Sequence, residues 1–258
     1  MKSELIILGC GGSVGVPRID NFWGNCKKNK KNIRTRCSAI IIKGSNSILI
    51  DTSPDIKNQL LKNKIKNVTS VLFTHEHADQ TNGLFELRPF YWRYKKKINV
   101  YGNFRTISSL IKRHDYLFKN NSKNTGYPPI VKANLIKSSF SLGEKKEKVF
   151  FKTIKVKHGK ISCVAYIFEK TAYISDCNDL SIVNMKELKN LKYLIIDCLQ
   201  LKRHPSHFNL DEVLYIIKHL NPKKAILTNL HYHLDYNYLL RKLPNNVKPA
   251  YDGLKINL

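Results

Sequence analysis

Two histidines and an aspartate follow one apolar run of this chain within a few residues. Residues 74–80 read THEHADQ and come directly after the apolar residues 71–73. His75 and His77 can converge on one cation if this segment is extended, and Asp79 can then face a second position. Neutral imidazole and carboxylate suit zinc, iron or manganese. The alternative is a polar turn that holds two histidines by coincidence, which we disfavour because loops rarely gather such ligands after a buried strand.

Further candidate ligands stand at the ends of other expected strands. Alternation over residues 154–158 places His158 at the inward end of one strand, and residues 172–176 place Asp176 likewise. An inward-facing Asp is costly unless it is paired or bound to a metal. The alternatives are a histidine satisfied within the core and a strand-end cap. Two more clusters add histidines, HPSH at 204–207 and NLHYH at 229–233.

The elements that must position these residues are short and alternate in type. Expected strands span residues 4–8, 38–43, 47–51, 68–73, 97–101, 149–157, 163–168, 171–175, 193–196 and 225–228. Expected helices span residues 54–63, 83–91, 105–114 and 210–220. Asn209 and Glu212 predict a capping box at the start of the last helix. The mixture predicts sheets packed together with helices outside, in one domain over residues 1–258. Residues 119–129 are expected to form a long surface loop over a site.

Composition sets limits on the class of protein. The chain has 258 residues, 42% of them hydrophobic, with 45 Lys and Arg against 19 Asp and Glu, giving a net charge of +26. Such an apolar content excludes disorder of the whole chain. No apolar run approaches the ~18 residues that span a bilayer, and we expect a cytoplasmic protein that does not bind membranes. Six cysteines form no CxxC pair, so a disulfide framework is not expected.

The net charge has two readings. Lys far outnumbers Arg, and the chain is rich in Lys, Asn and Ile, which favours compositional drift. The other reading is a positive field that attracts nucleic acid or phosphorylated substrates.

The whole constellation resembles the metallo-β-lactamase superfamily, whose signature is HxHxDH followed by a distant His, Asp and His. The resemblance is closer to the PhnP-like branch, the phosphoribosyl cyclic phosphodiesterases of the carbon–phosphorus lyase pathway. Supporting stretches lie at residues 9–17, 32–38, 49–55, 204–208 and 251–254. The resemblance implies a four-layer αββα metallo-β-lactamase sandwich over nearly the whole chain.

The resemblance also implies a metal-ligand set. His75, His77 and His158 correspond to the imidazole ligands of a first metal. Asp176 corresponds to the carboxylate that bridges two metals, and Asp79 to a ligand of the second metal. The implied cofactor is Zn²⁺ or Mn²⁺, one or two per chain.

Other positions correspond to residues around the metals. His207 corresponds to the general acid or phosphate-contacting group, and Asp51 to a strand-end Asp that supports the metal loop. Asp79 would orient the attacking hydroxide, so we assign it a catalytic role together with His207. Arg34 or Arg36 is a candidate phosphate contact, with surface charge as the alternative.

The sequence departs from the family pattern at the second metal. Gln80 and Asn229 stand where the family has histidines, which leaves Asp79 and Asp176 as its remaining ligands. Amide oxygens are weak zinc ligands but suit harder ions such as manganese. His231 would replace the missing ligand of the second metal if its loop had a different conformation from that of the family. The cysteine cluster that binds a structural zinc in some relatives is also missing.

The function that this resemblance implies is metal-dependent hydrolysis of a phosphodiester, with a small phosphorylated substrate such as a cyclic phosphate ester. A tRNA- or RNA-processing nuclease is the second reading, but no long arm insertion is evident and nucleic acid is not favoured as a partner. A mononuclear hydrolase of another ester, a thioester or lactam hydrolase, and a binding protein with a decayed site stay open. A homodimer is an expectation at the level of the family.

Overall fold

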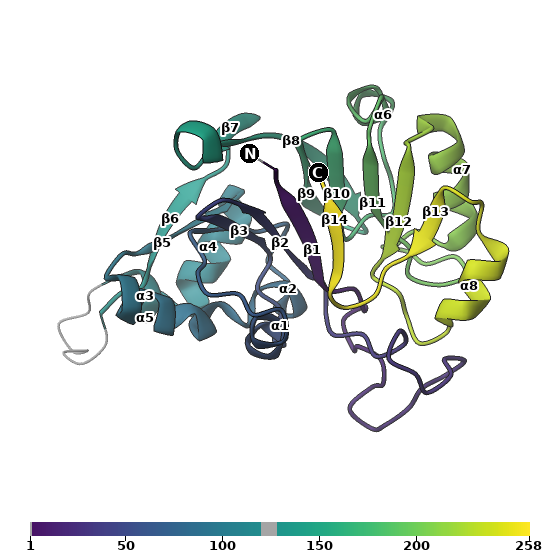
Figure 1. The fold of residues 1–258 in the computed structure, drawn as a ribbon, viewed down its shortest axis with the longest axis horizontal. Coiled ribbons are helices and arrows are strands. Elements are labelled where there is room, and N and C mark those ends of the chain that lie inside the picture. Colours follow the sequence, from purple (N-terminus) through teal and green to yellow (C-terminus); the bar gives the residue numbers. More distant parts are fainter. Residues whose placement is uncertain (1, 120–127) are drawn as a thin grey trace.

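The computed structural model describes residues 2–119 and 128–258. Most of the loop expected over residues 119–129 lies outside the described residues. Two mixed sheets of seven strands form the centre of the molecule (Figure 1). Within the described residues no helix is long and apolar enough to cross a membrane.

The first sheet combines an antiparallel part with a parallel part. β14, β1, β2 and β3 pair antiparallel, and β3 to β6 pair parallel. In spatial order its strands are β14 (Leu254–Asn257), β1 (Glu4–Gly9), β2 (Ser38–Lys43), β3 (Asn46–Ile50), β4 (Ser70–Leu72), β5 (Ile98–Gly102) and β6 (Val131–Leu135).

The second sheet has the same mixed plan. β13 to β10 pair parallel, and β10 to β7 pair antiparallel. In spatial order its strands are β13 (Val247–Pro249), β12 (Lys224–Thr228), β11 (Tyr193–Asp197), β10 (Thr171–Ile174), β9 (Ile161–Phe168), β8 (Val149–His158) and β7 (Ser139–Leu142).

Helices cover the outer face of each sheet. On the first sheet they are α1 (Ile56–Lys62), α2 (Ala78–Thr81), η1 (Leu84–Leu87), α3 (Arg88–Tyr94), α4 (Phe104–Arg113) and α5 (Asp115–Phe118). On the second they are α6 (Ile182–Glu187), α7 (Leu210–Leu220) and α8 (Tyr236–Lys242), and a short η2 (Lys145–Glu147) precedes β8.

Three apolar clusters fill the three interfaces between these layers. One joins Leu60 and Leu110 of the helices to Ile40 of the first sheet. A second lies between the sheets, and a third joins the second sheet to α7 and α8. The expected four-layer αββα arrangement is therefore confirmed.

The expected elements agree with the structure except for one helix and for the strands at the sheet edges. All ten expected strands and the helices α1, α4 and α7 are present, and the capping box of Asn209 and Glu212 is confirmed. The helix expected over residues 83–91 is wrong, because the chain forms η1 first and begins α3 only at Arg88, next to Pro89. The strands that sequence patterning missed are β6, β7, β13 and β14, which are the outer edges of the two sheets.

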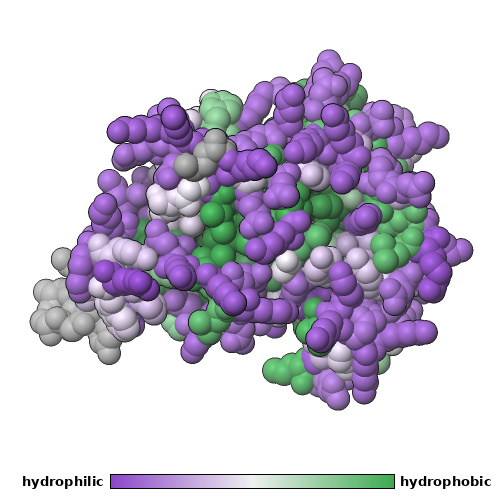
Figure 2. All heavy atoms as spheres, viewed as in Figure 1, coloured by the Kyte–Doolittle hydropathy of each residue, from purple (hydrophilic) through white to green (hydrophobic). Residues whose placement is uncertain are grey.

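The parallel strands determine where functional side chains can meet. Asp51 follows β3 and Thr74 follows β4 in the first sheet, while Asp176 follows β10 and Asn229 follows β12 in the second. Parallel neighbours end at a common edge, and the site residues from both sheets gather there. The rest of the surface is mainly hydrophilic on the face shown in Figure 2, where hydrophobic residues show chiefly along the middle.

Candidate metal centre

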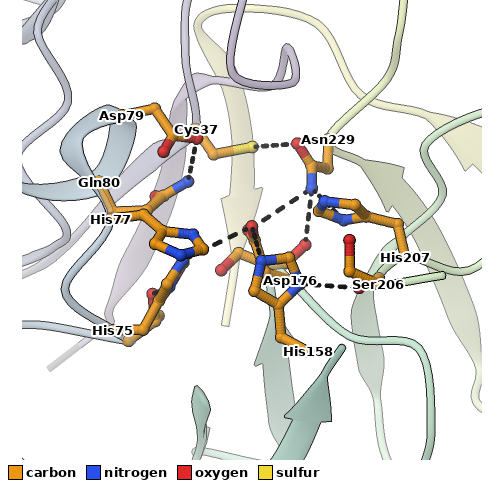
Figure 3. Close-up of polar contacts among 12 residues, drawn as sticks. Cys37, His75, His77, Asp79, Gln80, His158, Asp176, Ser206, His207 and Asn229 are labelled. Carbon is orange, nitrogen blue, oxygen red and sulfur yellow. Dashed lines mark hydrogen bonds and ion pairs between the residues drawn. The ribbon is translucent and has the colours of Figure 1, made fainter. Parts of the chain in front are cut away.

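Three histidines converge at the shared edge of the two sheets. Ligand-capable ring nitrogens of His75, His77 and His158 all lie within 4.8 Å of one another. His75 and His158 are buried, whereas His77, which precedes α2, is exposed. The rings are mutually tilted, with centroids 4.5 to 5.2 Å apart (Figure 3). This is the spacing of imidazoles around one cation.

Hydrogen bonds orient the His75 ring so that one nitrogen lone pair faces the centre. Asp51 accepts the Thr74 backbone N–H at 2.8 Å and the Thr74 hydroxyl at 2.9 Å. The Thr74 hydroxyl donates its only hydrogen to Asp51. Its oxygen lone pair therefore accepts the His75 Nδ1–H at 3.0 Å. The opposite nitrogen, His75 Nε2, then carries a lone pair, and it is buried without a hydrogen-bond partner. Burial and the neighbouring histidines lower the pKa of His75 well below its usual value, which keeps the ring neutral.

His158 is oriented in the same way by a backbone group. Its Nδ1 lies 2.7 Å from the Ser206 carbonyl oxygen, which can only accept a hydrogen bond. His158 Nε2 therefore presents a lone pair to the centre. Burial, partly offset by this bond, lowers the pKa of His158 to about 4.

Asp176 supplies a carboxylate to the same centre. Its Oδ2 lies 3.8 Å from His75 Nε2 and 3.7 Å from His158 Nε2. Burial raises the pKa of Asp176 to about 8, with the Asp79 charge adding to the rise and His207 opposing it. His207 is a positive neighbour of this buried carboxylate, and one divalent ion would in addition satisfy the carboxylate together with the lone-pair nitrogens. The donor set present therefore fits one metal ion.

His207 is fixed by a buried aspartate that sequence reasoning missed. His207 Nδ1 donates to Asp197 Oδ2 at 2.8 Å, and the Cys177 backbone N–H donates to the same oxygen at 2.9 Å. Burial opposes the positive charge of His207, but Asp197 outweighs it and raises the pKa of His207 to about 9. Asp197 ends β11 as Asp176 follows β10, so the strand-end rule applied to Asp176 could have found it.

Gln80 and Asn229 lie beside the two candidate carboxylates, Asp79 and Asp176. Gln80 Nε2 donates to Asp79 Oδ2 at 3.3 Å, while Gln80 Oε1 is buried without a partner. Asn229 Nδ2 points to the Ser175 carbonyl at 3.3 Å and to Asp176 Oδ1 at 3.5 Å. Figure 3 shows both amides turned toward the carboxylates. Asp79 itself is half-buried and lies outside the groups of three whose ligand atoms converge among the described residues.

His231 lies apart from the three converging histidines. It lines a cavity of about 530 Å³ together with Ser13, Val14, Arg18, Ile19, Asp20, Arg36 and Tyr232. Burial lowers the pKa of His231 to about 4, with smaller contributions from His233 and other cationic neighbours. Gly12 precedes Ser13 of the cavity wall and lies close to the centre, because a Cβ on Gly12 would be 3.5 Å from Asn229 Oδ1.

The two arginines proposed as phosphate contacts have different surroundings. Arg34 is fully buried and donates to the backbone oxygens of His231 at 3.2 Å and Leu234 at 2.7 Å. It cannot reach a ligand, so the expectation for Arg34 is wrong. Arg36 is half-exposed in the cavity wall and pairs with Asp55 at 3.0 Å.

The six cysteines are all free and buried. Cys37 is labelled beside the candidate centre in Figure 3, and its Sγ lies 3.9 Å from Asn229 Oδ1. Burial raises the pKa of Cys37 well above its usual value, so this thiol stays protonated and donates to the amide oxygen.

Known proteins share this fold and parts of this sequence. The beta-lactamase superfamily domain matches residues 46–232. An octanoyltransferase of Porphyromonas gingivalis (strain ATCC BAA-308 / W83) is 30% identical over an alignment that covers 97% of this chain and 50% of that protein. The chain thus spans about half the length of this curated relative.

Two solved structures resemble the molecule over its full length. A structure described as a new diphosphatase from the PhnP family has a TM-score of 0.89 and 28% identity, covering 100% of this chain and 98% of the other. Zn²⁺-bound PqqB from Methylobacterium extorquens has a TM-score of 0.77 and 15% identity, covering 99% and 100%, and so shares the fold. Because the matched domain spans more than half of the chain, the protein belongs to the beta-lactamase superfamily and has a PhnP-like metallo-β-lactamase fold.

Proposed function

We propose that this protein is a metal-dependent phosphodiesterase that acts on a small, cyclic or otherwise compact phosphate ester. In this proposal His75, His77, His158 and Asp176 hold a divalent ion, Zn²⁺ or Mn²⁺. The observation that carries the proposal is the convergence of three histidine ring nitrogens and one carboxylate at the shared edge of the two sheets. The likeness to a PhnP-family diphosphatase supports phosphorus as the reacting atom.

An ion held there would supply Lewis acidity that activates water and polarises a phosphoryl oxygen. The chain's own groups surround that position with complementary roles. Asp79, half-buried at the start of α2, can accept a hydrogen bond from the attacking water. His207, held by Asp197 across the centre, can donate a proton to the leaving oxygen.

The cavity beside His231 fits the remainder of a small anionic substrate. Its volume of about 530 Å³ is in the range of pockets that hold small ligands. Arg18 and Arg36 line it, and the Arg18 guanidinium lies 5.6 Å from the centre of the Tyr232 ring. Arg18 pairs with Asp20 and Arg36 pairs with Asp55. A second phosphate would therefore contact each guanidinium by sharing it with, or displacing, that carboxylate.

Hydrolysis of a chromogenic diester tests the proposal. Protein loaded with Mn²⁺ or Zn²⁺ is expected to release nitrophenol from bis(p-nitrophenyl) phosphate faster than from p-nitrophenyl phosphate or p-nitrophenyl acetate. His77→Ala should abolish turnover because it removes an exposed ligand. His219→Ala is the matched control, since His219 is a surface histidine at the end of α7. Faster hydrolysis of the carboxylic ester would exclude the phosphodiesterase assignment.

A structured RNA should be included as a competing substrate. The net charge of +26 would favour binding of a polyanion at low salt. The contrary outcome is that RNA is hydrolysed faster than the small diester, at a rate that falls steeply with salt. That result would contradict the small-ester phosphodiesterase and assign the protein as a nuclease.

A further inference from the structure

We propose that this centre holds a single divalent ion and that the side-chain amides of Gln80 and Asn229 occupy the place of a second one. The inference rests on the ligand assignment of the proposed function, but not on the identity of the substrate. It concerns how many ions the chain can hold, which is measurable without any turnover.

The first argument is that the two groups of ligand atoms share one histidine. Among the described residues, the groups able to hold an ion are His75, His77 and His158, and separately His158, Asp176 and His207. His158 Nδ1–H is committed to the Ser206 carbonyl, so the ring offers one lone pair, at Nε2. One lone pair serves one ion, so the two groups cannot each hold an ion at the same time, and the second group would also need His207 in its neutral form.

The second argument concerns Asn229, which follows β12 at the centre. Its Nδ2 lies 3.1 Å from His207 Nδ1, 3.3 Å from the Ser175 carbonyl oxygen and 3.5 Å from Asp176 Oδ1, so hydrogen atoms rather than a lone pair point at the carboxylate. Its oxygen turns away, toward the Cys37 thiol at 3.9 Å. The thiol is buried and is a weak donor, and it also lies 3.6 Å from Thr228 Oγ1, so it is compatible with this orientation of the amide. Nitrogen of an amide has no lone pair for a metal, so Asn229 fills the position without coordinating.

The third argument concerns Gln80, which is fully buried in α2. Its Nε2 donates to Asp79 Oδ2 at 3.3 Å. The reverse orientation would bring Gln80 Oε1 against a carboxylate oxygen, and two acceptors repel unless a cation lies between them. Asp79 thus receives an N–H bond where a second ion would supply positive charge. The two amides act on the two carboxylates, Asp79 and Asp176, that such an ion would need.

Counting bound ions tests the inference directly. Full-length protein is saturated with Mn²⁺, desalted, and examined by elemental analysis and by electron paramagnetic resonance. We expect about one Mn²⁺ per chain with the spectrum of an isolated ion, because two ions ~3.5–4 Å apart would be spin-coupled. About two ions per chain with a coupled spectrum would overturn the inference and would assign Gln80 Oε1 as a ligand.

Variants provide the converse test. Gln80→His with Asn229→His returns two lone pairs to the second position and should raise the content to about two ions with a coupled spectrum. Asn237→His adds a histidine at an exposed position of α8 and should leave the content at one. His77→Ala should reduce it toward zero. If the double variant does not fold, the wild-type content and spectrum still decide the question.

The two proposals fail separately. One ion per chain without diester hydrolysis would contradict the phosphodiesterase and leave the one-ion centre standing. Diester hydrolysis with two coupled ions would contradict the one-ion centre and leave the phosphodiesterase standing.

Discussion

The Asp51 carboxylate controls the His75 imidazole without touching it. The Thr74 hydroxyl donates to Asp51 at 2.9 Å and accepts from His75 Nδ1 at 3.0 Å, so the carboxylate sets which ring nitrogen keeps its proton. Asp51 has a φ of 61°, a left-handed conformation that directs its carboxylate back under the metal loop.

Asp51→Asn is expected to weaken metal binding by ~10–100-fold. The new Nδ2 would donate to the Thr74 hydroxyl, whose hydrogen would then turn toward His75 and favour the wrong tautomer. Asparagine tolerates a left-handed φ, so the backbone stays in place. Competition with a chromophoric chelator measures the affinity, and Thr74→Ser, which keeps the hydroxyl, is the control. An unchanged affinity in Asp51→Asn would contradict the relay.

Asp197→Asn and His207→Gln should both impair proton donation to the leaving oxygen. His207→Gln removes the proton donor and is expected to lower kcat by ~10²–10⁴-fold. Asp197→Asn leaves the imidazole without its anchor and should also lower kcat, with metal content unchanged. Because the two residues act as one unit, the double variant should be no slower than His207→Gln. Losses that multiply would show that Asp197 has a separate role.

Asp235 makes the protein more stable above the acid range. Burial opposes its charge, but N–H bonds from Tyr238 and Lys27 and the Asn32 amide outweigh burial and lower the pKa of Asp235. A lowered folded pKa gives stability that is complete above the unfolded pKa of ~3.9 and is lost as the pH falls through the folded value.

Asp235→Asn should therefore cost ~1–2 kcal/mol of unfolding free energy at pH 7 and progressively less below pH ~4. Urea unfolding at a series of pH values measures the difference from wild type. Glu144→Gln, an exposed carboxylate change, should show no such trend. A cost independent of pH would mean that packing, and not charge, explains the effect.

Arg34 holds the segment between β1 and β2 against the loop after β12. Its guanidinium donates to the backbone oxygens of His231 and Leu234 and to Asn32 Oδ1 at 3.0 Å. Arg34→Met leaves buried acceptors unpaired and should cost at least about 2 kcal/mol. Arg34→Lys keeps the charge but lacks the planar guanidinium, so it should lose less unfolding free energy than Arg34→Met. Thermal unfolding checks both, with exposed Arg18→Lys as the control; equal stability of Arg34→Met and wild type would refute the clamp.

The sequence could predict those parts of the fold that are buried on both sides. β1, β2 and β11 contain strongly apolar runs, and their patterning located them to within a residue or two. The missed strands β6, β7, β13 and β14 are short sheet edges with one partner each, so polar residues, and even Pro249, are tolerated there. Their assignment depends on pairing with a neighbour, which a local pattern does not contain.

The candidate site is likewise predictable where its residues follow a local pattern. His75 and His77 are two residues apart in sequence, and alternation predicted that His158 and Asp176 face inward, so the structure brings together residues that local rules had selected. The hydrogen bonds that orient them cross between segments, as from Thr74 to Asp51 or from His158 to the Ser206 carbonyl. The two expectations for Arg34, a phosphate contact or a surface charge, are likewise wrong because the folded loops bury it.

The origin of the ligands in two different sheets has a thermodynamic consequence. His75 and His77 belong to the β4 side, whereas His158 and Asp176 belong to the β8 and β10 side. A bound ion would thus be a cross-link between the two halves of the sandwich, and its binding energy would be added to the free energy of separating them. Metal supply would then set how cooperatively the halves unfold, and loss of the ion would first loosen the seam between the sheets.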